Sequence, residues 1–466
     1  MQTILNFAFC LIISITSISL SIHILKKGRF DPASGFVLGF CYFIGAPITQ
    51  LLLLGEINDA QIGLPALTIS SKTYLFAYLF LGCLATVAIY YFPYHKKKLA
   101  SRFLAVTDKN LASYYKFILF TYVTLATFTF ISSGKAAGGH WMENNHELYS
   151  SSTAAVISGN FYNVLRVIIP GIILYCHSKS IVSKKTATII LIIFSALELV
   201  ISSNRIILLF SLIALAGTYR VQMKRFILIA VLMAPLLLEF NALFPMIRGL
   251  MWSEGASLEQ TKYAIETGYS TEDTSESKIG KTFNSAFESS NILVMRYALE
   301  KYQRSENYLL GETIYIKSLT FFLPKTLWEN KPSSFNARMG YDISGSNVLS
   351  LNSTLLGEAF GNFSWFGAFV YLFNAIVFCS VLLLPKGRIL TYAGFFVAFA
   401  SWRFEFSFLA ISIFSIVCIT VAFNAYQSLA KRLIIRKKQQ TINFISKREK
   451  TSHRSQTSES NPVLHD

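Results

Sequence analysis

Roughly eleven apolar stretches alternate with polar connections along the 466 residues of this chain. Apolar runs of about 18 or more residues are long enough to cross a bilayer as helices. The pattern therefore predicts spans near residues 2–25, 34–54, 73–93, 115–133, 161–178, 186–203, 206–218, 226–244, 365–384, 390–402 and 406–429. The seventh and tenth stretches are short, and about eleven spans is the preferred number.

One long polar segment, from about Asn241 to Phe360, precedes the last three apolar stretches. A membrane protein that builds a single large domain on one face usually works there, so we expect the functional site in this segment. The predicted domains are spans with short loops over 1–240, a loop domain over 241–360, three spans over 361–430 and a basic, disordered tail over 431–466. The predicted fold class is an all-α polytopic membrane protein.

The composition agrees with this class, since 53% of residues are hydrophobic and 14% are charged. The net charge of +17 gathers at alternate connections rather than in one patch, which argues against nucleic acid as a partner. The basic clusters lie at 26–29, 96–102, 179–185, 220–225, 386–388 and 431–450. Because short cytoplasmic loops are enriched in Lys and Arg, we predict an outside amino terminus, a cytoplasmic carboxyl terminus and an outside loop domain. The basic tail is expected near anionic membrane lipids.

The sequence shows no pattern of metal ligands. All six cysteines lie inside apolar runs, without metal-ligand spacing. No Asp-x-Asp motif occurs, and the acidic cluster Glu272–Glu276 lies in a stretch rich in Ser, Thr and Gly. We therefore expect no metal and no cofactor.

Arginines at the ends of apolar stretches are the first candidates for binding. Arg205 and Arg403 lie in short polar breaks, Arg166 lies near the outer end of the fifth span, and Arg248 follows the eighth. A charge at membrane depth is costly, so it is usually paired or lines a cavity. These residues are either structural ion pairs or contacts to a lipid-linked diphosphate, whose oxygens a guanidinium binds in a bidentate manner.

The loop domain holds further candidates. Lys325 and Lys331 can add point charges beside a diphosphate, and Trp328 can offer a flat face to a sugar ring or belong to an interfacial aromatic belt. Glu358, at the outer mouth of the ninth span, is a candidate general base or a partner for a nearby Arg. Two further carboxylates, Glu405 and Glu312, are alternative bases.

The stretch Glu288–Arg304 has helical spacing, with apolar residues on one side and charges recurring at four-residue steps on the other. Such an amphipathic helix can lie on the membrane surface.

Four places resemble the Wzy-type O-antigen polymerases, also called oligosaccharide repeat unit polymerases. The run Phe321–Pro332 resembles the family's aromatic-Pro-x-x-Leu-Trp-x-x-Lys/Arg-Pro segment. Thr354–Gly367 resembles its Gly-Glu-x-x-x-Asn-Phe-Gly stretch, with Ser364 replacing the first glycine after Phe. Ser202–Arg205 is similar to the break before a span, and Trp402–Glu405 is similar to the late Arg-Glu element.

The resemblance implies a bacterial inner-membrane glycosyltransferase of GT-C-like fold, inverting or retaining. Such enzymes join repeat units carried on undecaprenyl diphosphate at the periplasmic face, with a chain-length regulator as an expected partner. It implies that Arg205, Arg403, Lys325 and Lys331 contact the diphosphate and that Glu358 is the base. The Arg-x10-Gly pattern of some members is not found in this chain.

Two other functions stay open. An O-antigen ligase is favoured by Arg205 and Leu209, which fit an Arg-x3-Leu pattern, but ligases use a histidine in the large loop and every histidine here lies elsewhere. A lipid-linked oligosaccharide flippase or other transporter would use ionisable residues near mid-membrane, and Glu198 and Glu239 are the main deep acids. Transporters, however, tend to have short loops on both faces and internal repeats.

Overall fold

The computed structural model describes residues 1–59, 62–94, 110–132, 152–202, 206–219, 284, 287–324, 326–345, 349–383 and 388–457. The chain forms two compact units, Met1–Ser415 and Ile416–Asp466. All packing described below lies within the first unit. Nearly all of its elements are helices, and the described strands are one short antiparallel pair, β1 (Glu56–Ile57) and β2 (Leu67–Thr68).

Seven stretches of helix in the described residues are long and apolar enough to cross a membrane. They are α1 (Gln2–Lys27), the run α2 (Pro32–Phe40), η1 (Cys41–Gly45) and α3 (Ala46–Leu54), α4 (Thr73–Tyr91), α5 (Leu111–Ser132), α7 (Thr153–Ser178), the run Thr354–Leu383 and the stretch Phe406–Arg432. Three further helices are α8 (Lys184–Ser202), α9 (Ile206–Tyr219) and α18 (Arg388–Phe404). This confirms an all-α protein with several membrane-spanning helices; the predicted span at 226–244 lies outside the described residues.

The turn between α1 and α2 follows from local sequence. Gly28 ends α1 in the left-handed conformation at φ 56, where a residue without a side chain is favoured. Asp31 then caps α2 by accepting a hydrogen bond from the Ser34 N–H at 2.8 Å, and Pro32 occupies the first turn. The connection therefore reverses the chain within a few residues.

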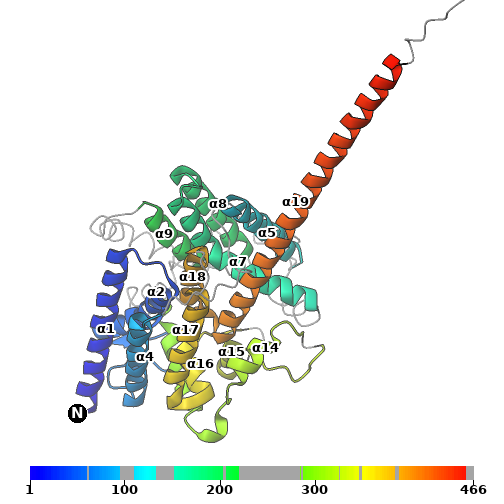
Figure 1. Ribbon diagram of the computed structural model, residues 1–466. Coiled ribbons are helices and arrows are strands. Elements are labelled where there is room, and N and C mark those ends of the chain that lie inside the picture. The colour runs from blue at the N-terminus through cyan, green and yellow to red at the C-terminus, as the bar shows by residue number, and fades with distance from the viewer. Residues whose placement is uncertain are drawn as a thin grey trace, which may run out of the picture. The chain divides into compact units, whose positions relative to one another are not determined.

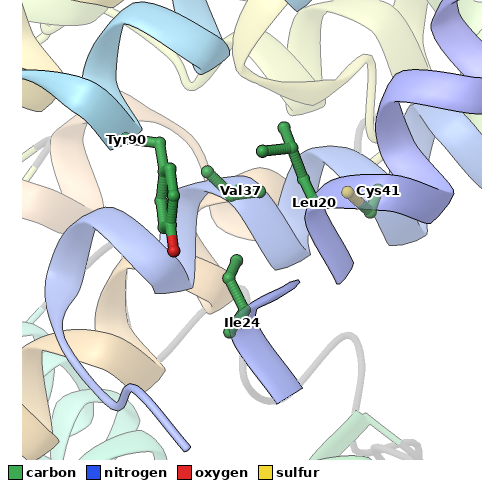
Figure 2. Close-up of a cluster of buried hydrophobic side chains, with 5 residues drawn as sticks. All are labelled: Leu20, Ile24, Val37, Cys41 and Tyr90. Carbon is green, nitrogen blue, oxygen red and sulfur yellow. The ribbon is translucent and has the colours of Figure 1, made fainter. Parts of the chain in front are cut away.

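A cluster of buried side chains joins α1, α2, η1 and α4 (Figure 2). Its members are Leu20, Ile24, Val37, Cys41 and Tyr90. These helices lie side by side near the amino terminus (Figure 1), and α17 (Gly367–Leu383) packs on α4.

Close contacts fix the position of α18 against α2. A side chain at Gly35 would meet the Phe395 carbonyl, and one at Gly39 would meet the Trp402 indole, so glycine lets the two helices approach closely. The indole N–H of Trp402 donates to the Phe36 carbonyl at 3.0 Å.

This packing sets the depth at which α18 ends. Trp402 contacts Phe40 with ring centroids 5.7 Å apart, and Phe399 lies 5.9 Å from Tyr42. These α2 and η1 residues stand about midway along the apolar run Pro32–Leu54. The charged break after α18 therefore stands level with the middle of this apolar run.

The loop domain is made of short helices. They are α13 (Ser290–Lys301), η4 (Ser305–Asn307), η5 (Glu312–Ile316), α14 (Lys317–Thr320) and α15 (Phe335–Ser344). They are followed by α16 (Thr354–Phe363) and η6 (Ser364–Phe366), which begin the apolar run Thr354–Leu383. Helix α13 packs against α16, and Ile292, Leu293, Met295, Ala298 and Leu299 are fully buried. The prediction that this amphipathic stretch lies on the membrane surface is wrong, because its apolar face is covered by α16.

The start of α1 and the loop domain lie at the same end of the helices. The Asn6 amide donates to the carbonyls of Ile69 and Ser71, at 2.8 and 2.7 Å. Arg296 of α13 donates to the Ala66 carbonyl at 3.0 Å. The segment that carries β2 thus connects the two regions, as expected if the amino terminus and the loop domain share one side of the membrane.

The last helix, α19 (Phe406–Thr457), continues through most of the tail for which the sequence predicted disorder. Residues 431–457 contain neither Gly nor Pro and are rich in Lys, Arg and Gln, which have good helix propensity. Low apolar content alone was therefore a poor guide to backbone conformation here.

Candidate functional site

A cavity of about 1070 Å³ lies between the loop domain, the first half of α7 and the break between α18 and α19. Helix α7 contributes Val156, Gly159, Asn160 and Asn163, which share one face of the helix. The charged residues that line the cavity are Lys301, Lys317, Lys331, Arg338, Asp342 and Glu405.

Cations outnumber carboxylates in this lining. Lys317 forms an ion pair with Glu405, and Lys301 forms one with Asp342. Lys331 donates to the Phe321 carbonyl at 3.3 Å and also to that of Leu323.

Arg338 extends the positive side of the cavity. Its guanidinium pairs with Glu312, which does not line the described cavity. Its Nε is buried and has no hydrogen-bond acceptor among the described residues. Glu312 therefore leaves one donor of this guanidinium without an acceptor, while Arg338 as a whole still lines the cavity.

Glu405 is the best defined carboxylate of the cavity. Its backbone has φ 135, a conformation that is rare outside glycine and costs of order 1–3 kcal/mol. Besides Lys317, its carboxylate accepts from the Phe335 N–H at 3.2 Å and from the Ser407 hydroxyl at 3.0 Å. These contacts hold a strained residue with its charge facing the cavity.

Glu358 has a different environment. It is 1% exposed in α16, and its Oε2 accepts from the Phe406 N–H at 2.8 Å, so it caps the amino-terminal end of α19. Its Oε1 is buried and unpaired among the described residues. Glu358 does not line the described cavity, and its described contact with the Phe406 N–H holds the break in place.

Asn362, in the same motif, connects α16 to the loop domain. Its amide donates to the Thr313 hydroxyl at 2.8 Å, and its carbonyl oxygen accepts from the Gly311 N–H at 3.1 Å. The Gly-Glu and Asn-Phe parts of the motif thus join loop segments to the membrane helices.

The charged residues of the Trp402–Glu405 element contact two different parts of the protein. Arg403 pairs with Glu288, whose side chain is 10% exposed and whose φ is 49. The carbonyl of Phe404 accepts from the Asn336 amide at 2.9 Å. Arg403 therefore ties the break to the start of the loop domain, while Glu405 faces the cavity.

Arg166 lies one turn beyond Asn163 on the cavity-lining face of α7. It is 8% exposed and 4.0 Å from Glu198, which also accepts from the hydroxyls of Tyr122 and Tyr162 at 2.7 and 2.9 Å. The guanidinium also stands over the Phe404 ring, 5.6 Å from its centroid. Two residues that the sequence singled out separately thus form one buried pair.

Of the remaining predicted residues, Trp328 is the one that the structure describes. Trp328 is half-buried, and its carbonyl accepts from the Lys331 N–H at 3.0 Å, but it does not line the described cavity. Arg205, Arg248 and Lys325 lie outside the described residues.

Sequence reasoning missed several residues that the cavity brings together. Lys301, Lys317, Arg338 and Asp342 were not among the candidates that the sequence suggested. Tyr302 is also in the lining, and burial raises its pKa to about 12, so it stays a neutral hydroxyl. A weak signal for Lys317 and Phe321 was their four-residue spacing, which places both on one helix face.

The described residues contain no group of three or more His, Cys, Asp or Glu side chains that could hold a metal ion. Comparisons with protein-family models, curated proteins and solved structures found no match to this chain.

Proposed function

We propose that the protein is a Wzy-type O-antigen polymerase with a GT-C-like arrangement of about eleven spans. It transfers a growing glycan from undecaprenyl diphosphate to the next lipid-linked repeat unit at the periplasmic face of the inner membrane. The observation that carries this proposal is a large cavity whose lining holds four cations and two carboxylates, beside a charged break that stands about midway along the apolar run Pro32–Leu54.

The size of the cavity fits an oligosaccharide. Its volume of about 1070 Å³ is at the upper end of the roughly 300–1,000 Å³ of small-molecule pockets. Asn160, Asn163, Ser333 and Tyr341 offer the uncharged donors and acceptors that sugar hydroxyls need.

The charges fit a diphosphate leaving group. In the reaction, the anomeric carbon loses its bond to the diphosphate oxygen and gains one to the acceptor hydroxyl, whose proton must be removed. Lys317, Lys331 and Arg338 can stabilise the charge on the departing diphosphate. Glu405, in place of Glu358, is the proposed acceptor of this proton, because it lines the cavity and Glu358 does not.

The direct test is a gene deletion followed by analysis of lipopolysaccharide. Loss of the polymerase leaves lipopolysaccharide capped with a single repeat, whereas loss of a flippase or ligase removes surface antigen. Purified protein in vesicles with undecaprenyl-diphosphate-linked repeat units should also produce a ladder of longer glycans. A ladder of normal length in the deletion strain would overturn the proposal.

A transporter is the second candidate, because the Arg166–Glu198 pair is a buried charge pair within the membrane helices. Vesicles loaded with lipid-linked repeat units distinguish the two. A flippase moves single units across the bilayer without lengthening them, and a polymerase lengthens units that are already on its own side.

A further inference from the structure

The helix formed by η5 and α14, Glu312–Thr320, has two unlike faces. Lys317 and, just beyond the helix, Phe321 line the cavity. On the opposite side Tyr315, Ile316, Leu319 and Phe322 are exposed, Leu319 by 74%. We call these four residues the outer face; water is a poor environment for so many large apolar side chains together.

Contacts with α17 place this helix beside a membrane span. The Asn374 amide donates to the Tyr315 hydroxyl at 3.3 Å. Asn374 is seven residues into α17, which at the rise of an α-helix puts it about 10 Å from the start of that helix. Tyr315 therefore lies alongside the apolar body of a span and not above its end.

The face of the helix that lines the cavity gives a second indication of how deep the helix lies relative to the membrane spans. Lys317 pairs with Glu405, in the break that follows α18. This break lies about midway along the run Pro32–Leu54, as the contact of Trp402 with Phe40 shows. Both faces of the helix thus place it inside the apolar layer.

The outer face also continues an exposed surface of α17. Phe369 and Phe373 of α17 and Phe366, which ends η6 just before it, follow one another at helical spacing and are each more than half exposed. A helix that crosses a bilayer exposes such side chains to lipid, and Tyr315 connects this surface to the outer face.

We infer that the Glu312–Thr320 helix is embedded in the lipid bilayer, with the outer face against hydrocarbon and the opposite face forming a wall of the cavity. The partner of this surface is therefore the membrane lipid. The inference does not depend on the proposed function. If that function holds, a lipid-linked substrate needs to pass only this one helix to reach Lys317 and Glu405.

Spin labelling in lipid vesicles tests this placement. Leu319→Cys is labelled in a full-length Cys418→Ser background, because Cys418 is partly exposed and the other five cysteines are buried. Phe373→Cys on α17 is the control for lipid exposure, and Arg304→Cys, at an exposed charged position of the loop domain, is the control for water exposure. Ile316→Cys repeats the measurement if the first variant folds poorly.

The expected result is that the labels at 319 and 373 collide readily with oxygen and poorly with a water-soluble nickel complex, while the label at 304 shows the reverse. A label at 319 that behaves like the one at 304 places the helix in water and overturns the inference. Poor access to both reagents means that a protein surface, either a partner or a second copy, covers the outer face, which also overturns it.

Discussion

Two ion pairs, Arg166–Glu198 and Lys317–Glu405, lie near the α18–α19 break, yet they are built differently. The side chains of Arg166 and Glu198 are 9% and 1% exposed, and two tyrosine hydroxyls complete the surroundings of the carboxylate. The Lys317–Glu405 pair lines a large cavity, on a backbone with positive φ. The first pair joins α7 to α8 in buried surroundings, whereas the second lies at the wall of an open cavity.

Breaking the buried pair should have the largest effect. Arg166→Ala leaves Glu198 as an uncompensated buried charge, which typically costs about 3–5 kcal/mol. We expect loss of folded protein, measured by fluorescence-detected size exclusion and thermal melting in detergent. The double variant Arg166→Met, Glu198→Gln should recover much of this loss; equal destabilisation in both variants would contradict the assignment.

Glu405→Gln keeps the shape of the side chain but removes the charge and the base. We expect a folded protein whose glycan transfer falls by about 10²–10⁴-fold. The measurement is the rate of chain extension in vesicles, with Glu358→Gln as the matched variant. If Glu358 is the base instead, only its variant will lose the rate while retaining a normal melting temperature.

Arg338→Gln removes a cation from the cavity wall. A hydrogen bond to a charged group contributes about 1.5–3 kcal/mol, so the KM for the lipid-diphosphate donor should rise by roughly tenfold or more with a smaller change in kcat. Steady-state kinetics with a water-soluble short-chain donor would measure both KM and kcat. A change in kcat alone would remove Arg338 from the diphosphate contacts.

The smallest effect is expected when an exposed ion pair is broken. Arg304 and Glu306 are 3.8 Å apart with side chains 82% and 69% exposed. Such surface pairs contribute about 0–1 kcal/mol, so Glu306→Gln should leave melting and transfer within error of the parent protein. A clear loss of transfer there would mean that exposure does not separate structural from functional pairs in this protein.

Hydropathy predicted the seven membrane-length helices that the described residues contain, because a span is defined by its own length and apolarity. It failed where burial depends on a neighbour. The pattern of α13 was read correctly as amphipathic, but α16, and not lipid, covers its apolar face. The helix that does expose apolar residues, Glu312–Thr320, has too few residues for its periodicity to be conspicuous.

Prediction of the candidate site from the sequence was limited in the same way, because it depends on contacts between distant residues. Sequence reasoning named Glu405, Lys331 and Arg166, all of which lie in or beside the cavity region. It ranked Glu358 and Arg403 higher, because position relative to a span cannot reveal that one caps α19 and the other pairs with Glu288.

By itself the sequence determined that this is a helical, multi-pass membrane protein with one large loop domain, since apolar length and charge distribution act locally. Only the tertiary structure decided which charges are neutralised and which face open space. That choice depends on partners far apart in the chain, as when α18 ends beside the end of α2, about midway along the apolar run Pro32–Leu54, and Glu405 pairs with Lys317.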